Sequence, residues 1–174
     1  EMTPGVKFAI EKFVTMWIEF NQKIKEIDIE LKSQAIKDRA TDVVYQSAPG
    51  IGPTSARILA NELGDLQQFE NERQLSSFVG VTPSEHSSGE HVRQGHITKQ
   101  GKPILRKILV QAAWTAIRYD KELRFVYNRI ATRAGCKRAI IAIARKLIGR
   151  IRACFVKETL YEARDLPKVQ CLPD

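Results

Sequence analysis

Hydrophobic residues recur along the first 31 positions of the chain at alternating spacings of four and three. The members of this apolar seam are Val6, Ile10, Phe13, Trp17, Phe20, Ile24, Ile27 and Leu31. Such spacing is typical of the a and d positions of a coiled coil, so residues 1–40 are predicted to form one long helix. Pro4 suits its first turn and Thr3 its N-cap. The seam either joins copies of the chain into a homodimer or higher oligomer, or packs along its own domain.

A second pattern occupies residues 42–64, where two helical runs flank the glycine-rich turn SAPGIGP of residues 47–53. It resembles helix-hairpin-helix modules, which grip a nucleic-acid phosphate with backbone N–H groups at the start of the second helix. In this chain the grip would involve Gly50, Ile51 and Gly52, because glycine permits positive φ and has no Cβ to keep the phosphate away. The alternative is a tight turn between two helices that binds no ligand.

A long polar segment separates these elements from the C-terminal helices. Residues 82–102, TPSEHSSGEHVRQGHITKQGK, hold little that could pack in a core, and they predict a long loop or a β-ribbon. Apolar residues at helical spacing then predict three helices over residues 104–157, the second from Glu122 to Arg133 and the third from near Cys136.

The pattern as a whole predicts a mainly α fold. We expect a long coiled-coil-like helix, then a helical domain over residues 41–160 that contains the hairpin motif and the long polar loop, and a tail over residues 161–174.

Basic charge is concentrated in one region. Residues 1–90 hold 9 Lys and Arg against 14 Asp and Glu, whereas residues 91–152 hold 16 against 2, within a net charge of +8. Such a region favours a nucleic-acid partner, because each phosphate that a cation neutralises releases condensed counterions. The candidate contacts are Arg93, Lys99, Lys102, Arg106, Lys107, Lys137, Arg138, Arg145 and Lys146. The alternative is a solvated, charged face of the helices.

Other features of the composition exclude several classes of protein. The sequence has no apolar run of the roughly 18 residues that a membrane span needs, and its charged first residues do not form a signal peptide. We therefore expect a cytoplasmic protein with no membrane partner. Its three cysteines are widely spaced and are expected to be free thiols.

Neither the histidines nor the carboxylates suggest a metal site. His86, His91 and His96 lie five residues apart, which matches no common zinc pattern. They are either bases or metal ligands, or they are exposed bystanders. The carboxylates show no two-metal arrangement; those considered are Glu62, Asp65, Glu85 and Glu90. No cofactor or metal is therefore expected within this chain.

Several motifs follow one another in a specific order over residues 41–157. They are APGIGPTSARILANELGD, LSSFVGVTPSEHSSG, GHITKQGKPILRKILVQAAW and KRAIIAIARKLIGRI. Together they closely resemble the C-terminal transposase domain of the insertion-sequence-110 family, the DEDD-type transposases related to the Piv invertase. The most specific parts are the Ser88-Gly89 pair, the Ile97-Thr98-Lys99-x-Gly101 segment, Leu105-Arg106 and the basic final helix.

This resemblance implies a function in DNA recombination and the transposition of a mobile insertion sequence in a bacterial or archaeal cell. Members of the family combine an N-terminal RuvC-like domain that holds divalent metal such as Mg²⁺, a coiled coil, and a domain like this one that supplies a serine. They act as multimers on DNA, guided by a bridge RNA. The residue that matches the nucleophile is Ser88, with Ser87 as the runner-up, and it would form a transient phosphoserine link to DNA.

The chemistry of a serine nucleophile indicates which groups should surround it. A serine hydroxyl needs a base, a metal or a dense positive field, and Arg93, Lys99, Lys102 and Arg106 follow closely enough to supply part of that field. The alternative for Ser88 is an ordinary turn residue.

The first residues lie within the predicted coiled-coil helix and include no RuvC-like strands. We expect the isolated chain to be inactive, either as an excised domain or as a degenerate remnant. The alternative function is a non-catalytic helix-hairpin-helix module for nucleic-acid binding and dimerisation.

Overall fold

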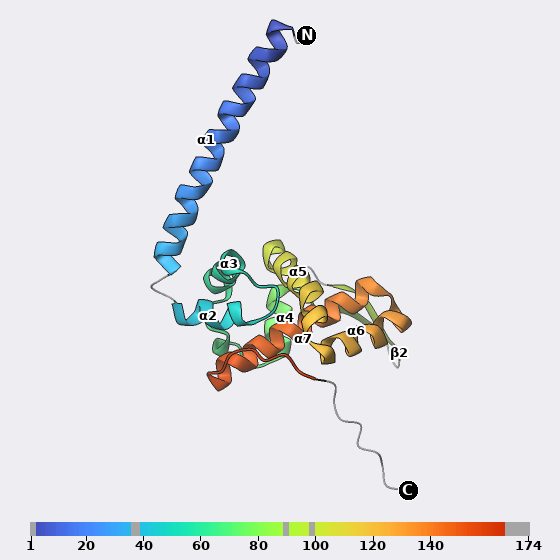
Figure 1. The fold of residues 1–174 in the computed structure, drawn as a ribbon. Coiled ribbons are helices and arrows are strands. Elements are labelled where there is room, and N and C mark those ends of the chain that lie inside the picture. Colours follow the sequence, from blue (N-terminus) through green and yellow to red (C-terminus); the bar gives the residue numbers. More distant parts are fainter. Residues whose placement is uncertain (1–2, 36–38, 89–90, 98–99, 166–174) are drawn as a thin grey trace. The chain divides into compact units, whose positions relative to one another are not determined.

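The computed structural model describes residues 3–35, 39–88, 91–97 and 100–165, with the backbone alone over most of residues 84–96 (Figure 1). The chain divides into two compact units, Glu1–Arg39 and Ala40–Asp174. It is mainly α-helical, as predicted. Over the described ranges, no helix combines the length and the apolar character that a membrane crossing requires.

The first unit is a single helix, α1 (Pro4–Ala35), as the heptad spacing predicts. Pro4 occupies its first position, and the backbone N–H of Lys7 donates to the Thr3 carbonyl oxygen. The apolar seam is exposed along this helix: the side chains of Trp17 and Phe20 are 68% and 59% exposed. A single helix has no second surface on which to bury an apolar face, so the seam is left in contact with solvent.

The helices that follow form the second unit. They are α2 (Arg39–Ser47), α3 (Pro53–Leu63), the 3-10 turn η1 (Leu66–Gln68), α4 (Glu72–Val79), α5 (Pro103–Tyr119), α6 (Lys121–Ala134) and α7 (Cys136–Lys157). The last three confirm the helices predicted over residues 104–157, and α2 and α3 flank the glycine-rich turn.

The core of the second unit forms around α7. This helix packs against α4, α5, α6 and η1, while α3 packs against α5 (Figure 1). Fully buried leucines and isoleucines recur at helical spacing on both central helices, among them Leu105 and Leu109 on α5 and Ile143 and Leu147 on α7. Burying each such side chain stabilises the fold by about 1.5–3 kcal/mol. The two central helices, α5 and α7, are therefore rigid supports for whatever their outer faces bind.

The polar segment folds as a β-ribbon, the second of the two alternatives that its sequence allowed. Strands β1 (Pro83–Ser88) and β2 (His91–Ile97) pair antiparallel, with a register irregularity near Pro83. Both strands carry polar residues at almost every position, so the alternation of apolar and polar residues that marks a half-buried strand is absent.

Candidate nucleic-acid interface and serine ribbon

The backbone register of the ribbon separates the two candidate serines. Ser88 is the partner of His91, and His86 is the partner of Arg93. Directly opposed residues share a face, and so do alternate residues along one strand, so these four residues fall on one face of the ribbon.

Ser87 falls on the other face of the ribbon, where it is the partner of Val92. The side chains of Ser88, Ser87 and Arg93 lie outside the described part of the structure, as do Gly89 and Lys99 altogether. Their chemical roles stay predictions.

The base of the ribbon is held by two cations that sequence analysis assigned to phosphate binding. The half-buried Arg106 guanidinium donates to the carbonyl oxygens of Val79 and Gly101, which lie just before and just after the ribbon. Lys102 forms an ion pair with Glu62 on α3. Both side chains thus tie residues that flank the ribbon to the helical core.

Two glycines complete this base. Gly80 ends α4 in the left-handed conformation, with φ of 74°, and a Cβ there would lie 2.7 Å from the backbone nitrogen of Gly101. A Cβ at Gly101 would in turn collide with the backbone of Phe78 and Val79. The two ends of the ribbon segment therefore approach α4 more closely than any other residue type allows.

In the turn between α2 and α3, the three residues predicted to bind phosphate differ in their packing and exposure. Gly50 has φ of 85°, and a Cβ there would lie 2.9 Å from the Cα of Ala112 and 2.7 Å from the Cβ of Thr115, both on α5. Ile51 is only 4% exposed and anchors the turn in the core. Packing against α5 is thus sufficient to explain both residues.

Gly52 is the part of this turn that remains open. It is exposed, has an extended backbone, and would place a Cβ in open space. As the N-cap of α3 it provides no side-chain hydrogen bond, and Pro53 follows in the first turn. The backbone N–H groups at the start of α3 are therefore the site in this motif where a phosphate could approach.

The two acidic residues between positions 91 and 152 are both used inside the fold. Asp120 is fully buried and accepts a hydrogen bond from Arg150 at 2.7 Å. Glu122 pairs with Arg150 at 2.7 Å and with Lys146 at 3.1 Å. Arg152 is also engaged, donating to the Phe69 carbonyl oxygen at 2.6 Å. Neither carboxylate is left to neutralise the outer faces of α5 to α7.

The cations that remain exposed on these three helices define an exposed basic surface. They include Lys107 and Arg118 on α5, Arg129 and Arg133 on α6, and Lys137 and Arg138 on α7. Arg145, also a predicted contact, is half-buried. Sequence analysis missed Arg118, Arg129 and Arg133, although their charges were counted in the basic region.

The environment of Asp120 and Glu122 keeps both groups ionised. Burial alone would raise the pKa of Asp120, but hydrogen bonds from the backbone N–H groups of Leu123 and Arg164 outweigh it, together with the Tyr161 hydroxyl and the Arg150 charge. The net result is a pKa below the usual range for Asp120. Ion pairs with Lys146 and Arg150 likewise outweigh burial and lower the pKa of Glu122.

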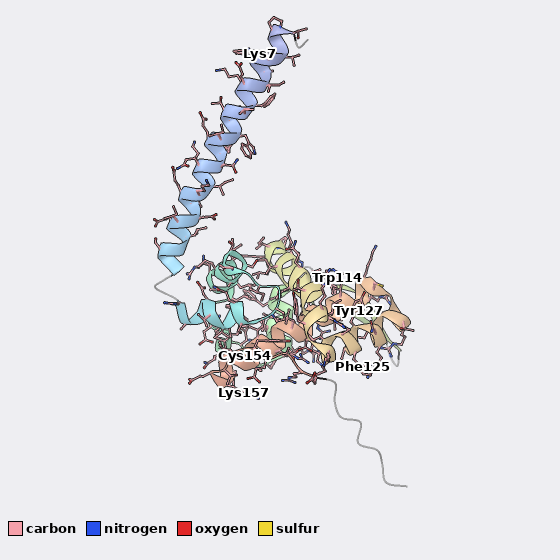
Figure 2. All side chains as sticks on the ribbon, in the orientation of Figure 1. Lys7, Trp114, Phe125, Tyr127, Cys154 and Lys157 are labelled. Carbon is pink, nitrogen blue, oxygen red and sulfur yellow. The ribbon has the colours of Figure 1, made fainter. Side chains whose placement is uncertain are left out.

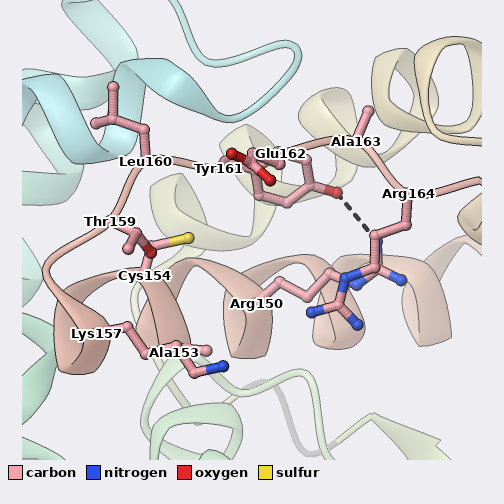
Figure 3. A pocket seen from close by; sticks show the side chains of 10 residues that line it. All are labelled: Arg150, Ala153, Cys154, Lys157, Thr159, Leu160, Tyr161, Glu162, Ala163 and Arg164. Atoms are coloured by element: carbon pink, nitrogen blue, oxygen red, sulfur yellow. Dashed lines mark hydrogen bonds between the residues drawn. The ribbon is translucent and has the colours of Figure 1, made fainter.

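A C-terminal segment closes over this ion-pair cluster. The Tyr161 hydroxyl accepts from Arg150 at 3.2 Å (Figure 3). It also donates to Asp120 at 2.9 Å, while the Tyr161 backbone N–H donates to the Ser47 hydroxyl oxygen at 2.9 Å. Burial raises the pKa of Tyr161 to about 12. The described part of the predicted tail, residues 161–165, is thus bound to α2, α6 and α7.

A cavity of about 260 Å³ lies between this segment and α7 (Figure 3). Its lining includes Arg150, Lys157 and Arg164, and also the buried Cys154 thiol, whose pKa is raised by burial. Arg150 forms ion pairs with Asp120 and Glu122, while its Nε is buried without a hydrogen-bond partner among the described residues.

No group of three or more metal-ligating side chains occurs within the described residues. Two of the carboxylates considered from the sequence have other roles, since Glu62 pairs with Lys102 and Asp65 caps η1 by accepting from the Gln67 backbone N–H. Glu85 and Glu90 lie outside the described side chains, as do the three histidines.

The sequence of this chain matches a known family of proteins. Residues 44–128 match the family model described as Transposase IS116/IS110/IS902. The transposase for insertion sequence element IS1111A of Coxiella burnetii is 31% identical over 165 residues, which cover 92% of this chain and 45% of that protein.

Two further relatives agree. A protein of insertion element IS110 of Streptomyces coelicolor is 29% identical and covers 70% of this chain and 30% of its own length. The pilin gene-inverting protein of Moraxella bovis is 33% identical and covers 58% of this chain and 32% of its own length. The chain spans less than half the length of these relatives. It carries a transposase domain of the IS116/IS110/IS902 family.

Proposed function

We propose that this chain is the C-terminal part of a transposase that binds nucleic acid through the exposed basic surface and supplies the Ser88 hydroxyl for DNA strand cleavage and exchange. The observation that carries the proposal is the internal use of Asp120 and Glu122. Because both acids of the region are paired with Arg150 and Lys146, the exposed cations of α5 to α7 are left to attract phosphates.

The chemistry assigned to Ser88 is a nucleophilic substitution at phosphorus. Its Oγ forms a bond to the scissile phosphorus while the bond to one deoxyribose oxygen breaks. The hydroxyl proton passes to a base, and the departing oxygen takes up a proton. On this proposal a divalent metal such as Mg²⁺ would be held by a RuvC-like domain of the complete protein, as the resemblance to the family implies.

The ribbon register supports Ser88 over Ser87. Ser88 shares its face with His86, His91 and Arg93, which are the residue types that accept a proton and bind a phosphate.

The test uses the complete transposase that contains this domain, supplied with guide RNA and DNA. Ser88→Ala should abolish strand cleavage and leave DNA binding largely intact, whereas the matched variant Ser87→Ala should retain cleavage. Unchanged cleavage by Ser88→Ala would exclude Ser88 as the nucleophile. Loss of both binding and cleavage would indicate a structural role for this position.

A non-catalytic module for nucleic-acid binding and dimerisation is the second candidate. The open N-terminus of α3 at Gly52 and the exposed seam of α1 favour it, because neither feature requires a reaction. On this alternative, both serine variants cleave as well as the parent protein, and the serines serve only the ribbon's local structure.

The proposal extends to two kinds of partner. A guide RNA would meet the same exposed cations as DNA, since both present a phosphate backbone. A second copy of the chain would cover the α1 seam, whose a and d spacing suits a parallel or antiparallel helix of the same sequence.

A further inference from the structure

A contact between the exposed Trp114 and the half-buried Tyr127 joins α5 to α6. The rings of Trp114 and Tyr127 contact each other edge to face, with their centroids 5.7 Å apart and their planes at 61° (Figure 2). Trp114 is 44% exposed although its neighbours Ala112 and Ala113 are completely buried. The core is complete without this indole ring, so its apolar surface is available to a partner.

The stripe of α5 that carries Trp114 is basic and polar. Lys107, Gln111, Trp114 and Arg118 follow at spacings of four, three and four, and all four are exposed. This spacing places them along one side of the helix. Cations thus lie on both sides of the exposed indole along the helix axis.

Two neighbouring elements add to the positive charge. Arg124 on α6 donates to the carbonyl oxygens of Ile117 at 2.8 Å and Arg118 at 2.5 Å, which fixes a guanidinium at the end of α5. The Tyr127 hydroxyl interacts with the Cys136 side chain at the start of α7. The exposed Lys137 and Arg138 follow directly in sequence.

We infer that Trp114 and Tyr127 form a stacking platform for an unpaired base of a nucleic-acid strand, with the phosphates on either side bound by Lys107 and Arg118. The inference rests on the proposed nucleic-acid binding and specifies its form: an aromatic face flanked by cations is how proteins hold single strands. A duplex keeps its bases stacked inside, so only an unpaired or extruded base can cover the indole.

A protein partner is disfavoured by the charges. Protein interfaces are depleted of charged residues at their centre, whereas Trp114 is flanked by Lys107 and Arg118 on its own helix. The nearest acids in sequence, Asp120 and Glu122, are paired within the fold and cannot balance these cations.

The test measures tryptophan fluorescence and affinity with matched strands. The chain has two tryptophans, so Trp17→Phe leaves Trp114 as the reporter. The probes are single strands of about 20 nucleotides in DNA and RNA form, the same strands with abasic sites, and the DNA duplex. We expect strong quenching of Trp114 by intact strands and little by abasic strands or duplex. The DNA and RNA arms identify which strand the platform prefers.

Trp114→Ala should weaken binding of the intact strand about 5- to 150-fold, the loss typical of one stacked base, and leave binding of the abasic strand unchanged. Trp114→Phe, which keeps an aromatic face, should recover most of the lost affinity and controls for folding. Lys107→Ala should weaken intact and abasic strands equally.

Three outcomes would overturn the inference. Equal quenching by intact and abasic strands, or wild-type affinity in Trp114→Ala, would show that no base stacks there while nucleic-acid binding itself stands. A wild-type chain that binds neither strand nor duplex would overturn the proposed function and the platform together.

Discussion

Arg150 on α7 donates to the carboxylate of Asp120 at 2.7 Å, where Asp120 is both the C-cap of α5 and the N-cap of α6. Asp120 is 0% exposed and Arg150 is 8% exposed. A single buried carboxylate therefore ties together the three helices that carry the exposed basic surface, and Tyr161 adds the C-terminal segment to the same group.

Removing the Arg150 cation from this pair should destabilise the fold strongly. Arg150→Met leaves Asp120 and Glu122 without the guanidinium that they share, and we expect a loss of about 3–5 kcal/mol in the free energy of unfolding. Urea denaturation measures the change. The matched variant Arg133→Met removes an exposed guanidinium and should change stability by less than about 0.5 kcal/mol. Similar losses in both variants would mean that the buried ion pair contributes no more to stability than an exposed guanidinium does.

Acid should weaken the same cluster. A carboxyl group whose folded-state pKa is lowered, as for Asp120, stabilises the fold above its unfolded pKa of about 4, and this contribution disappears as the pH falls through the folded-state pKa. We expect the free energy of unfolding to decline below about pH 4. Asp120→Asn should be less stable at neutral pH and should show a shallower decline in acid. A parallel decline in both proteins would assign the acid sensitivity to other carboxylates.

The two glycines of the α2–α3 turn should respond differently to substitution. Gly50→Ala forces a methyl group against Ala112 and Thr115 at a positive φ, and we expect it to lower stability by about 1–3 kcal/mol. Gly52→Ser places a favoured N-cap residue in open space and should preserve stability.

Gly52→Ser also tests whether the α2–α3 turn binds a phosphate or is a turn without a ligand. Its hydroxyl would occupy an N–H group of α3 and crowd an approaching phosphate, so nucleic-acid affinity should fall although the fold is intact. Filter binding beside a thermal melt measures both quantities. Full affinity in Gly52→Ser would identify the motif as a turn without a ligand.

The seam of α1 should hold copies of the chain together. Phe20 lies with Phe13, Val14, Met16 and Trp17 on a continuous apolar surface. Phe20→Asn should therefore lower the mass measured by sedimentation equilibrium to that of a monomer. Gln22→Asn changes an exposed residue outside the seam and should leave the assembly unchanged. A wild-type chain that is monomeric at high concentration would contradict the seam's role.

The elements that sequence analysis predicted well are those whose apolar spacing is local. The run from Leu105 to Ala116 shows helical periodicity within itself, and α5 follows it. The ribbon was left undecided because its strands have no apolar face. The tie between Tyr161 and Asp120 joins residues 41 positions apart and has no counterpart in any local pattern.

Charge patterns were informative about a region but not about individual residues. Lys102 and Arg106 carry the same charge as Lys107, yet Lys102 pairs with Glu62 and Arg106 donates to a carbonyl oxygen, whereas Lys107 belongs to the exposed basic surface. Whether a cation meets a carbonyl oxygen, a carboxylate or water depends on tertiary packing. The aromatic pair of Trp114 and Tyr127 was missed for a similar reason, since the contact joins two helices.

Because Asp120 and Arg150 are buried, the stability of this basic domain should depend on salt less than its nucleic-acid binding does. Ions in solution screen exposed charges strongly and buried pairs far less. Raising the ionic strength should therefore release nucleic acid from the outer faces of α5 to α7 while the helices stay assembled around their shared carboxylate. We therefore expect salt to release the nucleic acid and to leave the helical scaffold in place.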